Sequence, residues 1–339
     1  MMSIKKRIAL ILIAILLIYV LYLLISLPSA ESIIFKGFGW YGYLADDEVN
    51  EEVLERIKVL GGNSVNINVY YEYNPENESF ILLSNLTKIE EKINLIHKHD
   101  LIVFLSPFVN LVGGNYTGGS IDEPEPFLKK AKNISIDLAR FAQKNNVQIY
   151  ALWNELGLSI HKVQNHINLT NQWLQDVRRE VKKVYNGSIT TKEGVQLGFY
   201  NYNFSGFDYI GVTYYPFTTS FAVHPGTGQR LGGVENLEEY EDVVKEEIKK
   251  LNTLKQKFRS RGIILGEIGI DVVGGKFIEN DEESKKIRTS AYEIVLRNGK
   301  GKIDGFFFSK FGYEDGGSEE LDEVLKYYFR EKVKITTPT

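Results

Sequence analysis

Two glutamates and an asparagine are the residues of this sequence whose positions are best suited to chemistry. Asn154 and Glu155 directly follow an apolar run that ends at Trp153, and Glu267 follows a second apolar run, 263–265. A glycosidic bond is broken by one carboxylic acid that protonates the leaving oxygen and one carboxylate that attacks or activates water. Because each glutamate ends a short apolar segment, we expect both at the same end of a sheet. A helix cap or an ion pair is the alternative for either glutamate alone.

Eight short apolar runs alternate with amphipathic stretches from residue 33 onward, without a short repeat or a low-complexity linker. The apolar runs predict strands at 33–38, 64–70, 101–106, 148–153, 195–200, 209–214, 263–268 and 303–308. The amphipathic stretches predict helices at 50–60, 86–99, 126–145, 169–185, 237–259 and 281–297. Eight β-then-α units fit a (β/α)8 TIM barrel, an α/β fold in which the strand ends carry the chemistry. A division into two domains stays open.

Aromatic and polar residues gather where these predicted strands end. Aromatic rings stack on the apolar faces of sugars, while Asn, Glu and Tyr side chains hydrogen-bond to sugar hydroxyls. The candidate substrate-binding residues are Trp40, Tyr70, Tyr71, Asn110, Trp153, Tyr215, Phe308 and Phe311. The alternative for each of them is an ordinary packing role in the barrel.

The composition excludes several classes of protein. Of the 339 residues, 43% are hydrophobic and 25% are charged, so the chain can bury a core and does not resemble a disordered polymer. A net charge of −4 offers no basic surface for nucleic acid. The absence of cysteine rules out disulfides, thiolate metal sites and cysteine nucleophiles, and the five histidines are scattered. We therefore expect no metal, no cofactor and no nucleic-acid partner.

The N-terminus has the pattern of a transmembrane anchor. Residues 1–7 form a basic tail, and residues 8–27 carry no charge over a length that suits one bilayer crossing. The positive flank predicts that the N-terminal end is cytoplasmic and that the rest of the chain is extracellular. Cleavage as a signal peptide, which would give a secreted protein, is the alternative. We expect residues 28–32 to be a linker, 33–330 the barrel and 331–339 a C-terminal tail.

Seven Asn-x-Ser/Thr sequons agree with export and predict a glycoprotein. They begin at Asn77, Asn85, Asn115, Asn133, Asn168, Asn186 and Asn203. Chance in an Asn-rich chain is the alternative explanation, so the sequons only support the argument from the N-terminal segment.

The order and spacing of the strand-end residues resemble the clan A glycoside hydrolases. In that clan, the acid/base glutamate follows an asparagine after strand four and the nucleophile follows strand seven, as Asn154-Glu155 and Glu267 do here. Within the clan, three segments are most similar to glycoside hydrolase family 113: Gly37-Phe38-Gly39-Trp40, Leu60-Gly61-Gly62-Asn63-Ser64-Val65, and Phe207-Asp208-Tyr209-Ile210-Gly211 running into Tyr214-Tyr215-Pro216. The resemblance covers nearly the whole chain after the N-terminal segment and implies cleavage of β-1,4-mannan.

The same resemblance implies roles for individual residues. Glu155 would be the general acid/base, Glu267 the nucleophile, and Asn154 a partner of the sugar 2-hydroxyl. Tyr214 shares a strand face with Ile210 and Val212, so we expect its hydroxyl to point inward and donate to Glu267; the opposite parity of the next tyrosine makes that residue the less suitable donor.

Three positions depart from the clan pattern. Many clan members have an arginine near the end of strand two and a histidine after strand three, where this chain has Tyr70-Tyr71 and Phe108-Val109-Asn110. A tryptophan often lies under the central sugar at the end of strand eight, where this chain has Phe308 to Phe311. These differences bear on the identity of the sugar more than on the reaction.

The sequence therefore predicts a membrane-tethered, monomeric, retaining glycoside hydrolase that acts on a β-linked polysaccharide or oligosaccharide, with mannan as the first choice. A β-glucanase or β-galactanase of the same clan is the second choice. A surface carbohydrate-binding protein that keeps the barrel without catalysis is an alternative of another class, and a structural envelope protein is a third.

Overall fold

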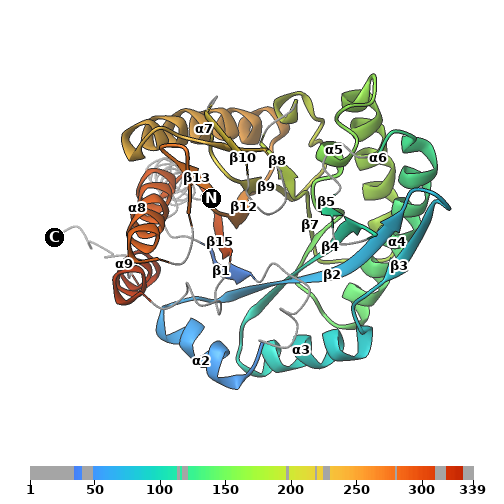
Figure 1. Ribbon diagram of the computed structural model, residues 1–339. Helices are drawn as coiled ribbons and strands as arrows, with labels where there is room; N and C mark the ends of the chain where they lie inside the picture. Colours follow the sequence, from blue (N-terminus) through green and yellow to red (C-terminus); the bar gives the residue numbers. More distant parts are fainter. Residues whose placement is uncertain are drawn as a thin grey trace, which may run out of the picture. The chain divides into compact units, whose positions relative to one another are not determined.

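The computed structural model describes residues 34–39, 49–112, 115–116, 121–195, 198–217, 220–223, 230–278, 281–309 and 318–330. Eight parallel strands close into a barrel (Figure 1). They are β1 (Phe35–Gly39), β2 (Ser64–Asn74), β4 (Ile102–Leu111), β6 (Ile149–Ala151), β7 (Ser188–Thr190), β9 (Tyr209–Tyr214), β12 (Gly262–Ile268) and β15 (Gly305–Ser309). Because β1 pairs with both β2 and β15, the sheet has no open edge and the predicted (β/α)8 barrel is confirmed.

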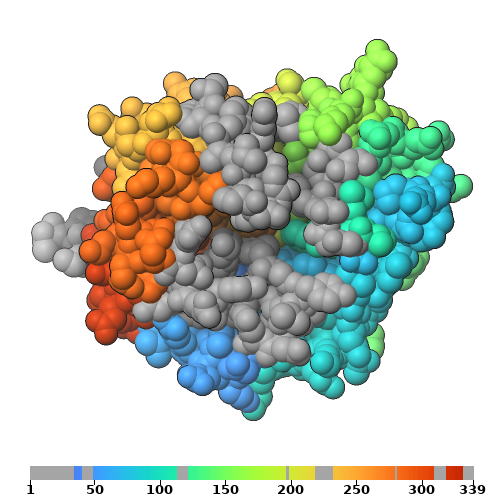
Figure 2. Space-filling model, in the orientation of Figure 1, coloured from blue at the N-terminus to red at the C-terminus, as the bar shows by residue number. Residues whose placement is uncertain are grey.

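Helices surround this barrel (Figure 1), and Figure 2 shows the same face in space-filling form. They are α2 (Glu51–Val59), α3 (Leu86–Lys98), α4 (Pro124–Lys144), α5 (Leu156–Ser159), α6 (His166–Val181), α7 (Leu237–Phe258), α8 (Glu282–Gly299) and α9 (Glu319–Arg330). Four of them begin after a residue whose side chain accepts a hydrogen bond from the first turn: Asn50, Asn85, Asn236 and Asp281. These caps satisfy backbone donors that an α-helix leaves unpaired.

Additional short strands lie at the carboxyl-terminal end of the barrel. β3 (Ser79–Leu82) pairs antiparallel with β2, β5 (Asn115–Tyr116) with β4, and β8 (Glu193–Gly194) runs beside β9. Two small hairpins follow strand ends: β10 (Ser220–Val223) with β11 (Arg230–Gly233), and β13 (Val272–Val273) with β14 (Lys276–Phe277).

Two apolar layers hold the barrel together. The inner layer fills the barrel with Phe35, Phe104, Ile149, Ala151, Tyr209, Ile264 and Phe307. The larger outer layer packs the other face of the strands against the helices. Successive strand residues alternate between the two layers, so Ile210, Val212 and Tyr214 of β9 lie in the outer layer. Both layers are apolar, and an apolar pattern alone therefore does not tell the inside of the barrel from the outside.

The fifth strand is not where the sequence pattern placed it. The apolar run expected as a strand at 195–200 contains instead a 3-10 turn, η2 (Phe199–Asn201). The fifth strand is Ser188–Thr190, whose polar side chains are accommodated because threonine hydroxyls bond to the backbone of β9, for example Thr190 Oγ1 to the Tyr209 carbonyl at 3.1 Å. Helix α9, near the end of the predicted barrel region, was also absent from the sequence prediction.

The predicted anchor at 8–27 and the segments 1–7, 28–32 and 331–339 lie outside the described residues. Within the described part of the chain, no helix has the length and apolar character needed to cross a membrane.

Candidate active site

A left-handed backbone turn places Glu155 at the mouth of the barrel. β6 ends at Ala151, and Glu155 follows with φ of 54°, a conformation that few residues other than glycine adopt. Its N–H donates to the Lys192 carbonyl at 2.8 Å. The next two N–H groups, of Leu156 and Gly157, donate to the buried carboxyl group of Glu193 at 3.2 and 3.0 Å. These three bonds hold the turn, and with it the direction of the Glu155 side chain.

A β-bulge turns Glu267 toward the same space. Along β12 the register with β9 shifts between Leu265 and Glu267, which leaves Gly266 as an extra residue. Leu265 faces the outer layer, so strict alternation would also send Glu267 outward. The extra residue brings Glu267 opposite Thr213, whose hydroxyl donates to Oε1 of Glu155. The bulge therefore places Glu267 on the inner face, where the Glu155 side chain also lies.

Two donors contact the Glu267 carboxylate. The Tyr215 hydroxyl donates to Oε1 at 2.8 Å, and the Lys192 ammonium forms an ion pair with Oε2 at 3.2 Å. Gly269 makes the tyrosine contact possible, because a Cβ there would come within 2.1 Å of the Tyr215 ring. The Glu267 side chain is 11% exposed and that of Lys192 is completely buried.

The two glutamates differ in their electrostatic surroundings. Burial and, after it, the nearby Glu267 charge raise the pKa of Glu155 to about 7, although Thr213 and Lys192 act in the opposite direction. Glu155 therefore carries a proton up to about neutral pH. Glu267 faces an ammonium and a phenol, both of which stabilise a carboxylate. The site combines one carboxylic acid with one carboxylate.

The expected contact from Tyr214 to Glu267 is wrong, and Tyr215 makes it instead. Tyr214 is the last residue of β9 and lies in the outer layer, where burial and then the Glu247 carboxyl group of α7 raise its pKa. The apolar residues of β9 face the helices rather than the inside of the barrel, which is why the expected contact does not form. Tyr215 has the parity of the inward Thr213 and therefore faces the two glutamates.

Three predicted sugar-binding aromatic residues also face the outer layer. Trp153 packs against Trp173 of α6, with 5.9 Å between the ring centroids. Phe308 packs against Tyr292 of α8, with 4.7 Å between the ring centroids. Tyr71 lies among the partly buried residues of the outer layer, and burial raises its pKa to about 12. Their burial against helices contradicts the prediction that they stack on substrate.

The remaining predicted residues divide into two groups. Tyr70 and Asn110 share strand faces with inward residues, and the ring of Tyr70 lies 5.3 Å from that of Phe108. Tyr70 is buried and Asn110 is half-buried, so both stay candidates for the wall of the site. Trp40 and Phe311 lie outside the described residues.

Asn154 presents a polar atom that suits a ligand. The residue is only 6% exposed, and its Oδ1 is buried without a hydrogen-bond partner in the part of the chain that the structure describes. A buried acceptor of this kind costs free energy unless something donates to it. Its position beside Glu155 fits a hydroxyl of a bound molecule.

Sequence reasoning missed four polar residues that support the site. Lys192 and Glu193 were assigned to a connection because the fifth strand was misplaced. Asn66 and Asn68 lie in the apolar run 64–70, and their two-residue spacing is the signal that could have identified an inward polar face of β2. No group of three His, Asp or Glu side chains suited to a metal occurs among the described residues.

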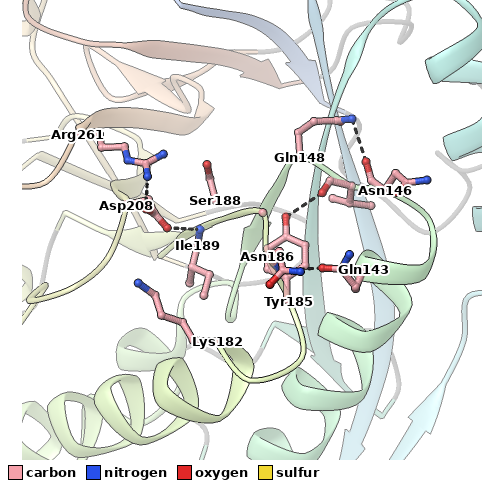
Figure 3. A pocket seen from close by; sticks show the side chains of 12 residues that line it. Gln143, Asn146, Gln148, Lys182, Tyr185, Asn186, Ser188, Ile189, Asp208 and Arg261 are labelled. Atoms are coloured by element: carbon pink, nitrogen blue, oxygen red, sulfur yellow. Dashed lines mark hydrogen bonds and ion pairs between the residues drawn. The ribbon is translucent and has the colours of Figure 1, made fainter.

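A polar hollow of about 640 Å³ lies at the other end of the barrel, away from both glutamates (Figure 3). Its lining comes from residues that precede or begin strands, such as Gln148, Ser188, Asp208 and Arg261. Many of its polar groups bond to one another: Asp208 accepts from the Ile189 N–H at 2.9 Å and pairs with Arg261 at 3.4 Å. This hollow has no pair of carboxyl groups in contrasting environments.

Comparison with known proteins identifies the fold. No protein-family model matches the sequence, and no curated protein gives a significant match. Among similar solved structures, a family 113 β-1,4-mannanase superposes with a TM-score of 0.65 at 15% identity over 89% of this chain and 100% of its own. The family 113 β-mannanase of Alicyclobacillus acidocaldarius gives 0.62 at 13% identity, with 89% and 99% covered. A broad-specificity endoglucanase of Clostridium cellulovorans gives 0.61 at 12% identity, with 88% and 95% covered. This chain thus shares the barrel of these clan A enzymes.

Proposed function

We propose that the protein is a retaining glycoside hydrolase that cleaves β-linked glycans, with Glu155 as general acid/base and Glu267 as nucleophile. One observation carries the proposal: two strand-end glutamates lie on the same inner face, one with its pKa raised by burial and the other held by an ammonium and a phenol. A double displacement requires this division into acid and carboxylate. The shared barrel fold supports the same reaction class.

In the first step, the Glu155 proton moves to the leaving oxygen as the bond from that oxygen to the anomeric carbon breaks. A Glu267 oxygen forms a bond to the same carbon, which gives a glycosyl ester. In the second step, Glu155, now a carboxylate, takes a proton from water, and the water oxygen displaces Glu267. Asn154, with its buried unpaired oxygen, is positioned to accept a hydrogen bond from the sugar 2-hydroxyl.

β-1,4-Mannan or manno-oligosaccharides are the proposed substrates. The sequence segments similar to family 113 and the solved β-mannanases with the same fold support this choice. A β-glucan or β-galactan is the second candidate, because a broad-specificity endoglucanase shares the fold to a similar degree. We further propose that residues 8–27 tether the enzyme to the outer face of the cell membrane, which the basic flank and the uncharged stretch support.

The test is sugar release by the full-length protein in mild detergent on mannan, β-glucan and β-galactan, beside Glu267→Gln. Release by the parent protein together with loss in the variant supports the proposal and names the substrate class. Retention of the configuration of the new anomeric centre, followed by NMR, tests the double displacement; inversion contradicts it. Binding without release from any of the three glycans favours a carbohydrate-binding protein.

A further inference from the structure

We propose that Lys192 is a positioning residue that acts as the counter-charge of both glutamates, holding the Glu267 carboxylate in place and balancing the negative charge as it passes to Glu155 during turnover. The proposal rests on the proposed double displacement. It starts from the 3.2 Å ion pair between Lys192 Nζ and Glu267 Oε2, in which the lysine side chain is completely buried.

The Lys192 ammonium lies near side-chain oxygens of three described residues. Besides Glu267, Oδ1 of Asn68 lies at 3.4 Å and Oδ1 of Asn66 at 3.5 Å. The amides are themselves fixed: Ser106 donates to Asn68 Oδ1 at 2.6 Å, and Asn66 Nδ2 donates to the Phe104 carbonyl at 2.9 Å. An ammonium has three N–H bonds, and a buried charge needs partners of this kind. The cluster is therefore built to hold a charged lysine.

The backbone fixes Lys192 in relation to both glutamates. Its carbonyl accepts the Glu155 N–H, while its side chain reaches Glu267. The preceding Thr191 is tied to β9, since its hydroxyl donates to the Gly211 carbonyl at 2.8 Å. A Cβ on Gly211 would come within 2.0 Å of the Thr191 carbonyl oxygen, so this close approach depends on glycine. One residue thus links the positions of the acid and the nucleophile.

The position of Lys192 beside both glutamates allows its ammonium to balance their negative charge in each step of the reaction. Before reaction, Glu155 is neutral and Glu267 is negative; in the glycosyl ester, Glu267 is neutral and Glu155 is negative. One negative charge remains beside one ammonium in both states. Lys192 interacts electrostatically with each glutamate, and their charges offset part of the lowering of its pKa by burial. Among the described residues, the other charged or titratable groups that interact with the two glutamates include Tyr215, Glu193 and, acting on Glu155, Asp271.

The test compares the parent protein with Lys192→Met and with Lys192→Gln, which keeps a donor for the two asparagines but has no charge. Lys255→Met is the matched control, because Lys255 also pairs with a carboxylate, Asp304, but at the other end of the barrel. Circular dichroism and thermal unfolding first establish which variants fold. The readouts are kcat/KM as a function of pH and the 13C titration of the Glu267 carboxyl group by NMR, assigned with Glu267→Gln.

We expect both Lys192 variants to lose about 100-fold or more in kcat/KM. Because the ammonium stabilises both carboxylates, its loss should move both limbs of the pH profile upward, by about one to three units. Lys255→Met should change neither. A folded Lys192 variant with unmoved limbs and an unchanged Glu267 titration overturns the inference.

A chemical rescue experiment distinguishes the effect of the Lys192 charge from that of its side-chain shape. The chain has no cysteine, so Lys192→Cys introduces a single thiol that can be alkylated with 2-bromoethylamine in denaturant and then refolded. The product restores an ammonium at nearly the length of lysine, and we expect activity and pH profile to return. Alkylation with iodoacetamide should not restore them; equal recovery with both reagents overturns the inference. The NMR titration needs no turnover, so it remains decisive if the parent protein hydrolyses none of the glycans and the proposed function fails.

Discussion

Two lysine–carboxylate pairs lie at opposite ends of this barrel, and their difference shows how burial sets apart the end that carries the candidate active site. At the amino-terminal end, Lys255 pairs with Asp304 at 2.9 Å, and the side chains are 29% and 17% exposed. At the carboxyl-terminal end, the Lys192 side chain has no exposure at all beside Glu267. Partial exposure lets water solvate both members of the first pair, whereas the buried ammonium of the second must be satisfied by the protein. Burial, rather than the presence of opposite charges, distinguishes the two ends.

The carboxyl groups at the two ends of the barrel have different environments and different roles. Asp304 Oδ2 also accepts the Ile263 N–H at 2.8 Å, so it joins the start of a strand to a helix and has a structural role. Glu155 is directed into the mouth of the barrel by a left-handed turn that the neighbouring Glu193 supports. The carboxyl group at the amino-terminal end thus joins elements of the fold, whereas Glu155 at the carboxyl-terminal end is directed into the candidate active site.

The largest contrast should come from removing one carboxylate at each end. Glu155→Gln should lower kcat on an unactivated glycan by about 10²–10⁴-fold, because proton transfer to the leaving oxygen is lost. For a substrate with a good leaving group, kcat/KM, which reports the first step, should fall much less. Asp304→Asn should keep kcat and lower the free energy of unfolding by about 1–3 kcal/mol, since a buried N–H loses its charged acceptor. Steady-state kinetics and urea unfolding of both variants check this, and equal kinetic losses would remove the contrast.

Two consecutive tyrosines allow a comparison within the carboxyl-terminal end of the barrel. Tyr215→Phe removes the hydrogen bond to Glu267 and should lower kcat/KM by about 10–100-fold, the equivalent of a hydrogen bond to a charged group. Tyr214→Phe alters the outer layer only and should leave kcat/KM within about twofold while changing stability. Measuring both variants on the same glycan decides which tyrosine serves the site; the reverse order of effects would contradict the geometry.

The pH dependence of activity should follow Glu155. This glutamate must be protonated to act as an acid, and its pKa is about 7, so kcat/KM should fall as the pH rises through about 7. The limb should be absent with a substrate whose leaving group needs no proton. A profile flat to pH 9 on an unactivated glycan would show that another group supplies the proton.

Stability should also change with pH because of a buried acid beside the site. Burial raises the pKa of Glu193 to about 8, above its usual 4.5, so its stabilising contribution is complete below about pH 4.5 and is lost as the pH rises through 8. Glu193→Gln mimics the neutral acid. In this variant the free energy of unfolding should fall less between pH 5 and 8 than in the parent protein, by more than about 1.4 kcal/mol, the equivalent of one pKa unit. Urea unfolding at a series of pH values measures the slope; an unchanged slope would assign the decline to other groups.

The smallest effect is expected at the polar hollow of the amino-terminal end. Arg261 pairs with Asp208 there, but its side chain is 69% exposed. Arg261→Ala should lower the free energy of unfolding by less than about 1 kcal/mol and leave kcat/KM unchanged. A clear loss of activity in this variant would mean that the two ends are coupled.

Local chemistry made the main elements of this barrel predictable. Helix α2 begins after Asn50 and ends before a glycine pair, and β9 has the bounds that its apolar run indicates. The fifth strand was missed because it is three residues long and polar, its hydroxyls satisfied by a neighbouring strand that sequence alone does not reveal.

The site was predictable in its carboxylates but not in its supporting residues. Glu155 and Glu267 each end an apolar run, which is a local signal. The choice of Tyr214 over Tyr215 failed because inward and outward layers are both apolar, and Lys192 was hidden by the missed strand. Which residues contact the glutamates depends on how the strands close into a barrel, and all eight strands together determine this.

The single-residue bulge at Gly266 has a consequence at the level of the gene. An in-frame loss of that one codon would restore strict alternation in β12 and turn Glu267 toward the helices. Three nucleotides thus decide whether the proposed nucleophile faces the mouth of the barrel or the helices. Such a deletion variant, assayed for fold and for sugar release, should retain the barrel and lose release completely.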